Sequence, residues 1–244
     1  MDSGGNKDAV YLLFLPLGFF IVINPHSLLV FFLLGITEIG SIYTIMKMHS
    51  YSHLSISTIV SRTRLIWVAL LSFLVFGEKL ETIQYAAIAL LFVGLLIITT
   101  PKELKGDKGV KYAHLSAFFA GLIAVFLKAS SPYISSQGAL VIMGVFPIFV
   151  FPIVMKDSKK RLLAAAKRVS FVSSMPLAAN ILASYLYALA LSMGSASIVV
   201  AIYQGSMIFS VLGGIIFLQE RHDIRKKLIG SILAFLAIIL LALK

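Results

Sequence analysis

A few ionisable side chains lie inside long apolar runs of this sequence, where a charge is costly. Such groups persist in membrane segments mainly where they pair with one another or serve a function. A carboxyl group there can carry a proton, and a guanidinium group offers two parallel donors to a carboxylate or phosphate. The four candidates are Glu38, Arg62, Arg64 and Lys128.

Neutral polar side chains in other apolar runs form a second set of candidates. Amides can hydrogen-bond to a polar solute, and tyrosine rings can stack against an organic one. Tyrosines in membrane helices also serve as packing or interface anchors, so both roles stay open. The residues of this set are Asn180, Tyr185, Tyr203 and Gln204.

An internal repeat connects the two sets. Residues 43–99 align without a gap to residues 142 positions later, so that Tyr43 falls on Tyr185 and Glu78 falls on Glu220. Repeated blocks of apolar helices are typical of membrane transporters, which bind substrate between the two copies. We therefore expect a solute site between the two halves.

The same shift matches polar residues in pairs. Glu38 falls on Asn180, and Arg62 falls on Gln204. Polar groups at matching depths in both copies would suit a site near the middle of the membrane. The alternative is that Glu38 and Arg62 neutralise one another without a ligand. Because Arg62 and Arg64 are two residues apart, they cannot face the same way on a helix, and one could extend to the membrane interface instead.

The composition is that of a membrane protein, since 59% of the residues are hydrophobic and 13% are charged. The apolar runs are each about 20 residues long, enough to cross the hydrocarbon core as helices. We predict an all-α membrane bundle of about nine transmembrane helices. Their ranges are 9–24, 27–47, 54–76, 82–100, 112–130, 135–155, 168–192, 197–219 and 227–243.

The widest polar gap, residues 101–111, is a basic linker that divides this bundle. It predicts a first repeat of four helices over residues 9–100 and a second repeat of five helices over residues 112–243. The first repeat then lacks a counterpart to helix 112–130. A lost span, a late start site or a fragment would each explain the difference.

Loop charges predict the orientation in the bilayer. The linker carries four lysines, residues 156–168 carry six basic residues and residues 220–227 carry four, whereas the alternate loops near 131–134 and 192–196 carry none. Basic loops face the cytoplasm, which places the N-terminus inside and the C-terminus outside. The short loops and the lack of a targeting peptide favour the plasma membrane of a prokaryote.

Several function classes are disfavoured. The net charge of +11 is explained by orientation in the membrane, so nucleic acid is not an expected partner. The chain has no cysteine, which excludes thiolate metal sites and cysteine nucleophiles. Motifs for phosphate binding or zinc hydrolysis are missing from the sequence. We therefore predict that the protein is not an enzyme and has no cofactor, metal site or catalytic residue.

The repeat resembles the EamA family of the drug/metabolite transporter superfamily. The matching segments are Tyr185-x-Tyr-Ala-Leu, Gly194-Ser-Ala-Ser, Glu220-Arg221, Gly230, Ser55 to Ser57, Gly77-Glu78-Lys79 and Gly94. The resemblance implies ten helices in two inverted five-helix repeats around a central cavity. It also implies a cytoplasmic C-terminus, against the loop charges, and it places Lys128 where the family often has a lysine.

We expect a secondary transporter that moves small polar organic metabolites by alternating access. Its partners would be that metabolite, the lipid bilayer and a proton or other coupling ion; a homodimer is left open. The alternatives are a non-transporting remnant or scaffold with a structural Glu38–Arg62 pair, and a passive channel or flippase.

Overall fold

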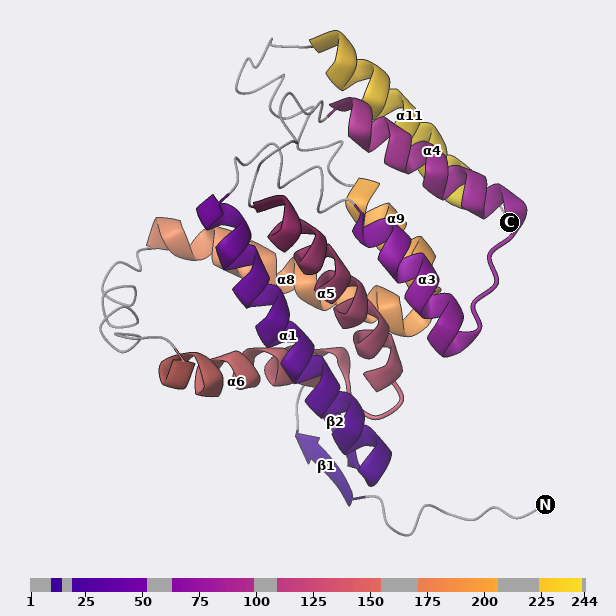
Figure 1. The fold of residues 1–244 in the computed structure, drawn as a ribbon. Helices are drawn as coiled ribbons and strands as arrows, with labels where there is room; N and C mark the ends of the chain where they lie inside the picture. The colour runs from indigo at the N-terminus through magenta and orange to yellow at the C-terminus, as the bar shows by residue number, and fades with distance from the viewer. Residues whose placement is uncertain are drawn as a thin grey trace, which may run out of the picture. The chain divides into compact units, whose positions relative to one another are not determined.

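The computed structural model of the protein describes residues 10–14, 19–51, 63–98, 109–154, 171–205 and 224–242. Within these ranges the chain forms eight helices and one two-stranded hairpin (Figure 1). The elements are β1 (Val10–Phe14), β2 (Phe19–Ile23), α1 (Pro25–Tyr51), α3 (Arg64–Phe76), α4 (Thr82–Ile98), α5 (Gly109–Ser130), α6 (Ser136–Val154), α8 (Phe171–Met193), α9 (Ala196–Gly205) and α11 (Ile224–Ala242).

Most of the predicted helices are confirmed to within a few residues. The predictions for 27–47, 82–100, 112–130, 135–155, 168–192 and 227–243 correspond to α1, α4, α5, α6, α8 and α11. Helices α3 and α9 confirm the described parts of the predictions for 54–76 and 197–219. Residues 52–62 and 206–223 lie outside the described ranges, and Arg62 lies there with them.

The predicted helix over residues 9–24 is wrong. The described residues of this stretch form the antiparallel strands β1 and β2, in which Val10 pairs with Ile23 and Phe14 pairs with Phe19. The sequence contains two reasons. Pro16 and Gly18 fall inside the apolar run and disfavour a helix interior, and the flanking residues are mainly β-branched or aromatic, which favours strands.

Strand β2 also pairs on its other side. The Val22 N–H donates to the Tyr133 carbonyl oxygen at 2.6 Å, and the Ser135 N–H donates to the Phe20 carbonyl oxygen at 3.1 Å. These bonds join the hairpin to the turn between α5 and α6. Backbone groups of an edge strand in an apolar environment need such partners.

Helix α1 begins with a reciprocal cap. The Ser27 N–H donates to the Asn24 side-chain oxygen at 2.7 Å, and the Asn24 N–H donates to the Ser27 hydroxyl oxygen at 2.9 Å. Pro25 occupies the first helical position, where its missing N–H costs nothing. Pro25 therefore starts this helix, whereas the sequence suggested that it separates two helices.

By contacts the chain divides into two compact units, each drawing on both halves of the sequence. The first unit comprises Met1–Ile39 and Phe126–Met193, and the second comprises Gly40–Val125 and Gly194–Lys244. In the first unit, α6 packs against α8 and against β2. Here the Phe146 ring of α6 lies directly over Gly35 of α1, where a Cβ atom would overlap the ring.

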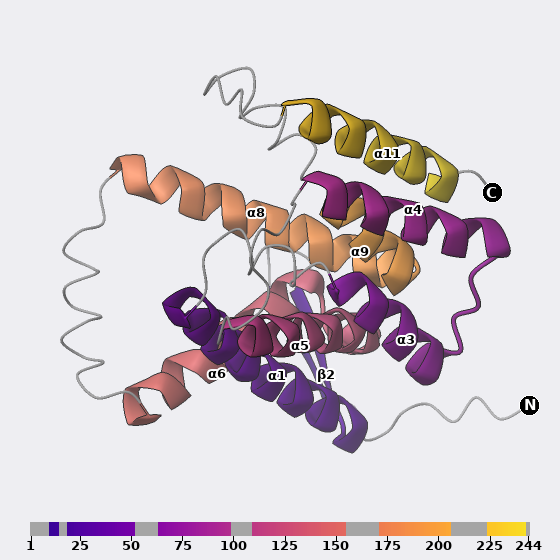
Figure 2. The same ribbon diagram turned by 45° about the horizontal axis from the view of Figure 1, so that its top comes forward.

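In the second unit, α4 and α11 lie side by side along their lengths and run in opposite directions (Figures 1 and 2). They begin at Thr82 and Ile224, 142 residues apart, which is the spacing of the sequence repeat. A Cβ atom on Gly94 would lie 2.8 Å from the Gly230 carbonyl oxygen, so the two backbones approach closely at this point. Small residues permit such helix contacts in lipid.

The outer surface of the described helices is largely apolar. Among the described residues, α1 and α5 are long and apolar enough to cross a membrane. Every described helix also exposes at least one large hydrophobic side chain. Exposed apolar area of this extent is typical of a surface that contacts lipid or another protein.

Candidate functional site

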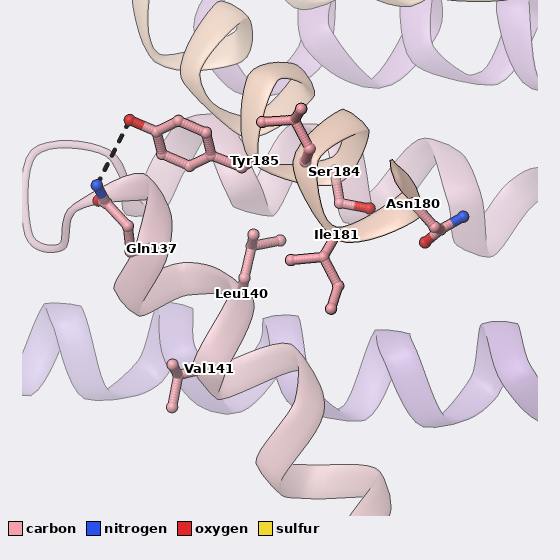
Figure 3. A pocket seen from close by; sticks show the side chains of 8 residues that line it. Gln137, Leu140, Val141, Asn180, Ile181, Ser184 and Tyr185 are labelled. Atoms are coloured by element: carbon pink, nitrogen blue, oxygen red, sulfur yellow. Dashed lines mark hydrogen bonds between the residues drawn. The ribbon is translucent and has the colours of Figure 1, made fainter. Parts of the chain in front are cut away.

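The first unit contains a pocket of about 710 Å³ between α6 and α8 (Figure 3). Two predicted site residues, Asn180 and Tyr185, contribute to its lining. The other lining residues were not singled out by sequence reasoning, and they are Gln137, Leu140, Val141, Ile181, Leu182 and Ser184. A volume of this size is within the range of roughly 300 to 1,000 Å³ found for sites that bind small organic molecules.

Helical spacing explains how both helices supply the pocket. On α8, Asn180 and Ser184 lie one turn apart and form a polar row. Ile181 and Tyr185 also lie one turn apart and form a neighbouring row of one apolar and one aromatic side chain. On α6, Gln137 is followed by apolar residues three and four positions later, on the same face. The pocket is therefore formed by one face of each helix.

A hydrogen bond closes one end of the pocket. The Gln137 side-chain amide donates to the Tyr185 hydroxyl oxygen at 3.4 Å. Leu140 and Ile181 project into the space between the helices, and Asn180 lies at the other end of this row (Figure 3). The arrangement puts polar groups at both ends and an apolar surface between them.

The described residues that line the pocket carry no formal charge, since they are amides, hydroxyls and aliphatic side chains. A charged solute would find no opposite charge on these side chains, whereas an uncharged solute could use their amide and hydroxyl groups as donors and acceptors. The chemistry of this lining therefore suits a neutral molecule with both polar and apolar parts.

Two other predicted residues pair with each other in the second unit. The Arg64 guanidinium carbon lies 5.3 Å from the centre of the Tyr203 ring, which is within the range of a cation–π contact. The Arg64 Nε atom is buried and has no hydrogen-bond partner among the described residues. Gln204, the neighbour of Tyr203 on α9, is buried with 3% exposure.

The remaining predicted residues lie elsewhere. Glu38 is half-buried in α1 of the first unit, and the described part of the chain gives its carboxylate no hydrogen bond or ion pair. Lys128 is half-buried in the last turn of α5, where its carbonyl oxygen accepts from the Ser131 hydroxyl at 2.9 Å. Arg62 falls outside the described ranges.

A second polar cluster joins α3 to α9 in the second unit. The Glu78 carboxylate accepts a hydrogen bond from the Ser195 hydroxyl at 2.7 Å, from the Ala196 N–H at 3.1 Å and from the Ser197 hydroxyl at 3.5 Å. The Ser72 and Ser197 hydroxyl oxygens are 2.7 Å apart. We call these five residues the Glu78 cluster. From the sequence, Glu78 is interpreted as a charge at a helix end, with a gating contact as the alternative; its partners, 117 to 119 residues away, could not be named.

Comparison with known proteins agrees with this helical architecture. One solved structure, described only as a crystal structure of a protein, has the same fold with a TM-score of 0.67. It is 14% identical in sequence, and the match covers 91% of this chain and 79% of that one. No curated protein sequence matches the chain.

A family model of membrane transporters matches the second half of the chain and part of the linker. The match runs over residues 107–243, more than half of the 244 residues, and so assigns the family. Membership makes this an integral membrane protein with a polytopic helical bundle. The chain belongs to the EamA-like transporter family.

Proposed function

We propose that the protein is a secondary transporter that moves small, uncharged organic metabolites with polar groups across the plasma membrane. The observation that carries this proposal is the α6–α8 pocket, whose lining combines uncharged polar and apolar side chains. Asn180 and Tyr185 would contact the solute there. The other candidates would line the pathway or couple it to an ion, and they are Glu38, Arg62, Arg64, Lys128, Tyr203 and Gln204.

Alternating access is the proposed mechanism. In transporters with inverted repeats, corresponding helices run in opposite directions, and one repeat moves against the other around a central site. The antiparallel α4 and α11, which begin 142 residues apart, support such a pair of repeats. We propose that α1, α3 and α4 belong to the first repeat and that α5, α6, α8, α9 and α11 belong to the second, so the described part of the first repeat has fewer helices than the four predicted from the sequence.

A thermal-shift screen of the purified protein in detergent tests the solute class. A ligand that binds the folded state raises the apparent melting temperature. We expect nucleosides or neutral sugars to stabilise the protein, and organic acids and organic cations to leave it unchanged. Stabilisation by charged compounds alone would contradict the proposed solute class.

Tyr185→Phe and its control decide whether the pocket is the site. The substitution removes only the hydroxyl that accepts from Gln137, so the protein should fold while the ligand-induced shift falls. Tyr85→Phe is the matched control, because Tyr85 is an exposed tyrosine on α4. Equal ligand shifts in the two variants would place the solute elsewhere.

Lipid translocation is a second candidate function. Ile181 and Leu182 line the pocket while 57% and 58% exposed, so the pocket is open on an apolar side. An acyl chain could enter there from the bilayer. Transfer of a fluorescent phospholipid between the leaflets of proteoliposomes, with no uptake of soluble compounds, would favour this function over solute transport.

A further inference from the structure

The Glu78 cluster connects the two halves of the sequence at one point. Glu78 and Ser72 belong to the first half, whereas Ser195, Ala196 and Ser197 belong to the second. All five residues lie within the second unit, where α3 and α9 pack together. The contact is therefore a direct link between the two proposed repeats.

The position of Glu78 is set by the end of α3. Gly77 ends this helix in the left-handed conformation, with φ of +64°, which glycine adopts without strain. The Gly77 N–H donates to the Phe73 carbonyl oxygen at 2.9 Å and closes the last turn. Glu78 is the next residue, so its backbone position is set by the conformation of this helix end.

The Glu78 carboxylate also caps the N-terminus of α9. The first N–H groups of a helix have no partner within the helix and attract negative charge. The Ser195 carbonyl oxygen accepts the first helical bond, from the Val199 N–H at 3.0 Å, while the Ser195 hydroxyl donates to Glu78. Glu78 thus caps α9 from a distance of 118 residues along the chain.

Such a contact favours two discrete states, one with the contact formed and one with it open. In the formed state, the negative carboxylate offsets the partial positive charge of the helix N-terminus. Partial separation would remove these hydrogen bonds from the carboxylate and from the Ala196 N–H, which is costly until water replaces them. In alternating access one repeat rocks or gates against the other, so contacts between repeats at the ends of the pathway open and close.

We propose that the Glu78 cluster is the latch that holds one end of the transport pathway closed. This inference rests on the proposed transport function. Along the sequence, one predicted membrane helix separates each basic loop from the loop of Glu78 or from the loop before α9, so the positive-inside rule places the latch at the outer end. Opening to the outside then requires that Glu78 leave the N-terminus of α9.

A cysteine pair tests the latch directly, because the natural chain contains no cysteine. In Ser72→Cys/Ser197→Cys, the two sulfur atoms replace hydroxyl oxygens 2.7 Å apart, close enough for a disulfide to form with an added copper–phenanthroline oxidant. We expect oxidation to abolish solute counterflow in proteoliposomes and a reductant to restore it. Each single-cysteine variant, treated in the same way, is the control.

Two results would overturn the latch. One is a disulfide-linked protein that transports at the rate of the reduced protein, and the other is failure of the pair to cross-link under oxidation. Failure of the proposed function itself is distinguishable, because the wild-type protein would then show no counterflow at all.

Labelling of a single cysteine provides an independent readout without transport. A Ser72→Cys thiol should react with a membrane-impermeant maleimide about tenfold faster when Glu78→Gln is added, because the closed state loses a charge-assisted hydrogen bond. Glu81→Gln is the matched control, since Glu81 is an exposed acidic residue three positions later. Equal labelling rates in the two backgrounds would contradict the latch.

Discussion

The hydroxyl oxygens of Ser72 and Ser197 lie 2.7 Å apart, although 125 residues separate the two serines. Both side chains are buried, with exposures of 0% and 3%. Buried hydroxyl groups in an apolar bundle require hydrogen-bond partners, so each serine satisfies the other. The pair fixes α3 against α9 beside the Glu78 carboxylate.

Close packing of α4 against α11 predicts that Gly94 cannot be enlarged. A Cβ atom at this position would lie 2.8 Å from the Gly230 carbonyl oxygen and 3.0 Å from the Ala234 nitrogen, and backbone atoms cannot move aside easily. We expect Gly94→Ala to lower the free energy of unfolding by about 1 to 3 kcal/mol. Thermal unfolding in detergent measures the change.

The control for this prediction is Gly144→Ala in α6. Apart from the backbone of its own helix, no atom of the described residues lies within 4 Å of a Cβ atom built there, so the substitution should not destabilise the protein. If both alanine variants melt at the wild-type temperature, the close approach of α4 and α11 is not present in the protein.

The cap of α1 makes a smaller prediction for stability. Asn24→Ala removes the acceptor for the Ser27 N–H and should cost about 1 kcal/mol of unfolding free energy. Asn24→Gly should cost only about a few tenths of a kcal/mol, because glycine is tolerated at this position. Chemical unfolding followed by circular dichroism compares the variants. An alanine variant no less stable than the glycine variant would rule out a capping role.

Filling the α6–α8 pocket should prevent solute binding without unfolding the protein. Leu140→Trp introduces a larger side chain between the two helices, and the ligand-induced thermal shift should disappear. Ile148→Trp is the matched control on the same helix, since Ile148 is 67% exposed and does not line the pocket. Retained binding by Leu140→Trp, at wild-type affinity, would argue that the solute binds elsewhere.

Glu38 is predicted to couple transport to protons. Its carboxylate has no hydrogen bond or ion pair in the described part of the chain, and an intramembrane carboxyl group of this kind is a candidate proton carrier. Glu38→Gln should abolish accumulation driven by a pH gradient while exchange of solute at equal pH continues.

Glu81→Gln provides the comparison for Glu38, because it removes an exposed carboxylate from the start of α4. Uptake of solute is measured in proteoliposomes with and without an imposed pH gradient. If Glu38→Gln still accumulates solute in response to the gradient, the coupling group is another residue.

Sequence alone predicts most of the helices because the length of an apolar run is a local property. It fails at residues 9–24, where the run contains Pro16 and Gly18 and its described residues form a hairpin. The length and hydrophobicity of a run do not distinguish one helix from two short apolar strands. In this segment Pro16 and Gly18 are the sequence signals that favour strands.

The candidate site could be predicted only in part. Asn180 and Tyr185 were identified as polar residues in a membrane helix, and both line the pocket. Gln137 lies in the first turn of α6, and nothing near it in sequence indicates its bond to Tyr185. The partners of Glu78 are equally remote, since no local pattern relates it to Ser195.

Solute counterflow in proteoliposomes tests the central claim most directly. Vesicles are loaded with an unlabelled nucleoside or sugar that stabilises the protein in the thermal screen, and entry of the labelled compound is followed over time. The account predicts a transient, saturable accumulation of label that is lost in Leu140→Trp. Absence of accumulation in the wild type, with binding intact, would contradict transport. Accumulation of equal size in Leu140→Trp would contradict the assignment of the pocket.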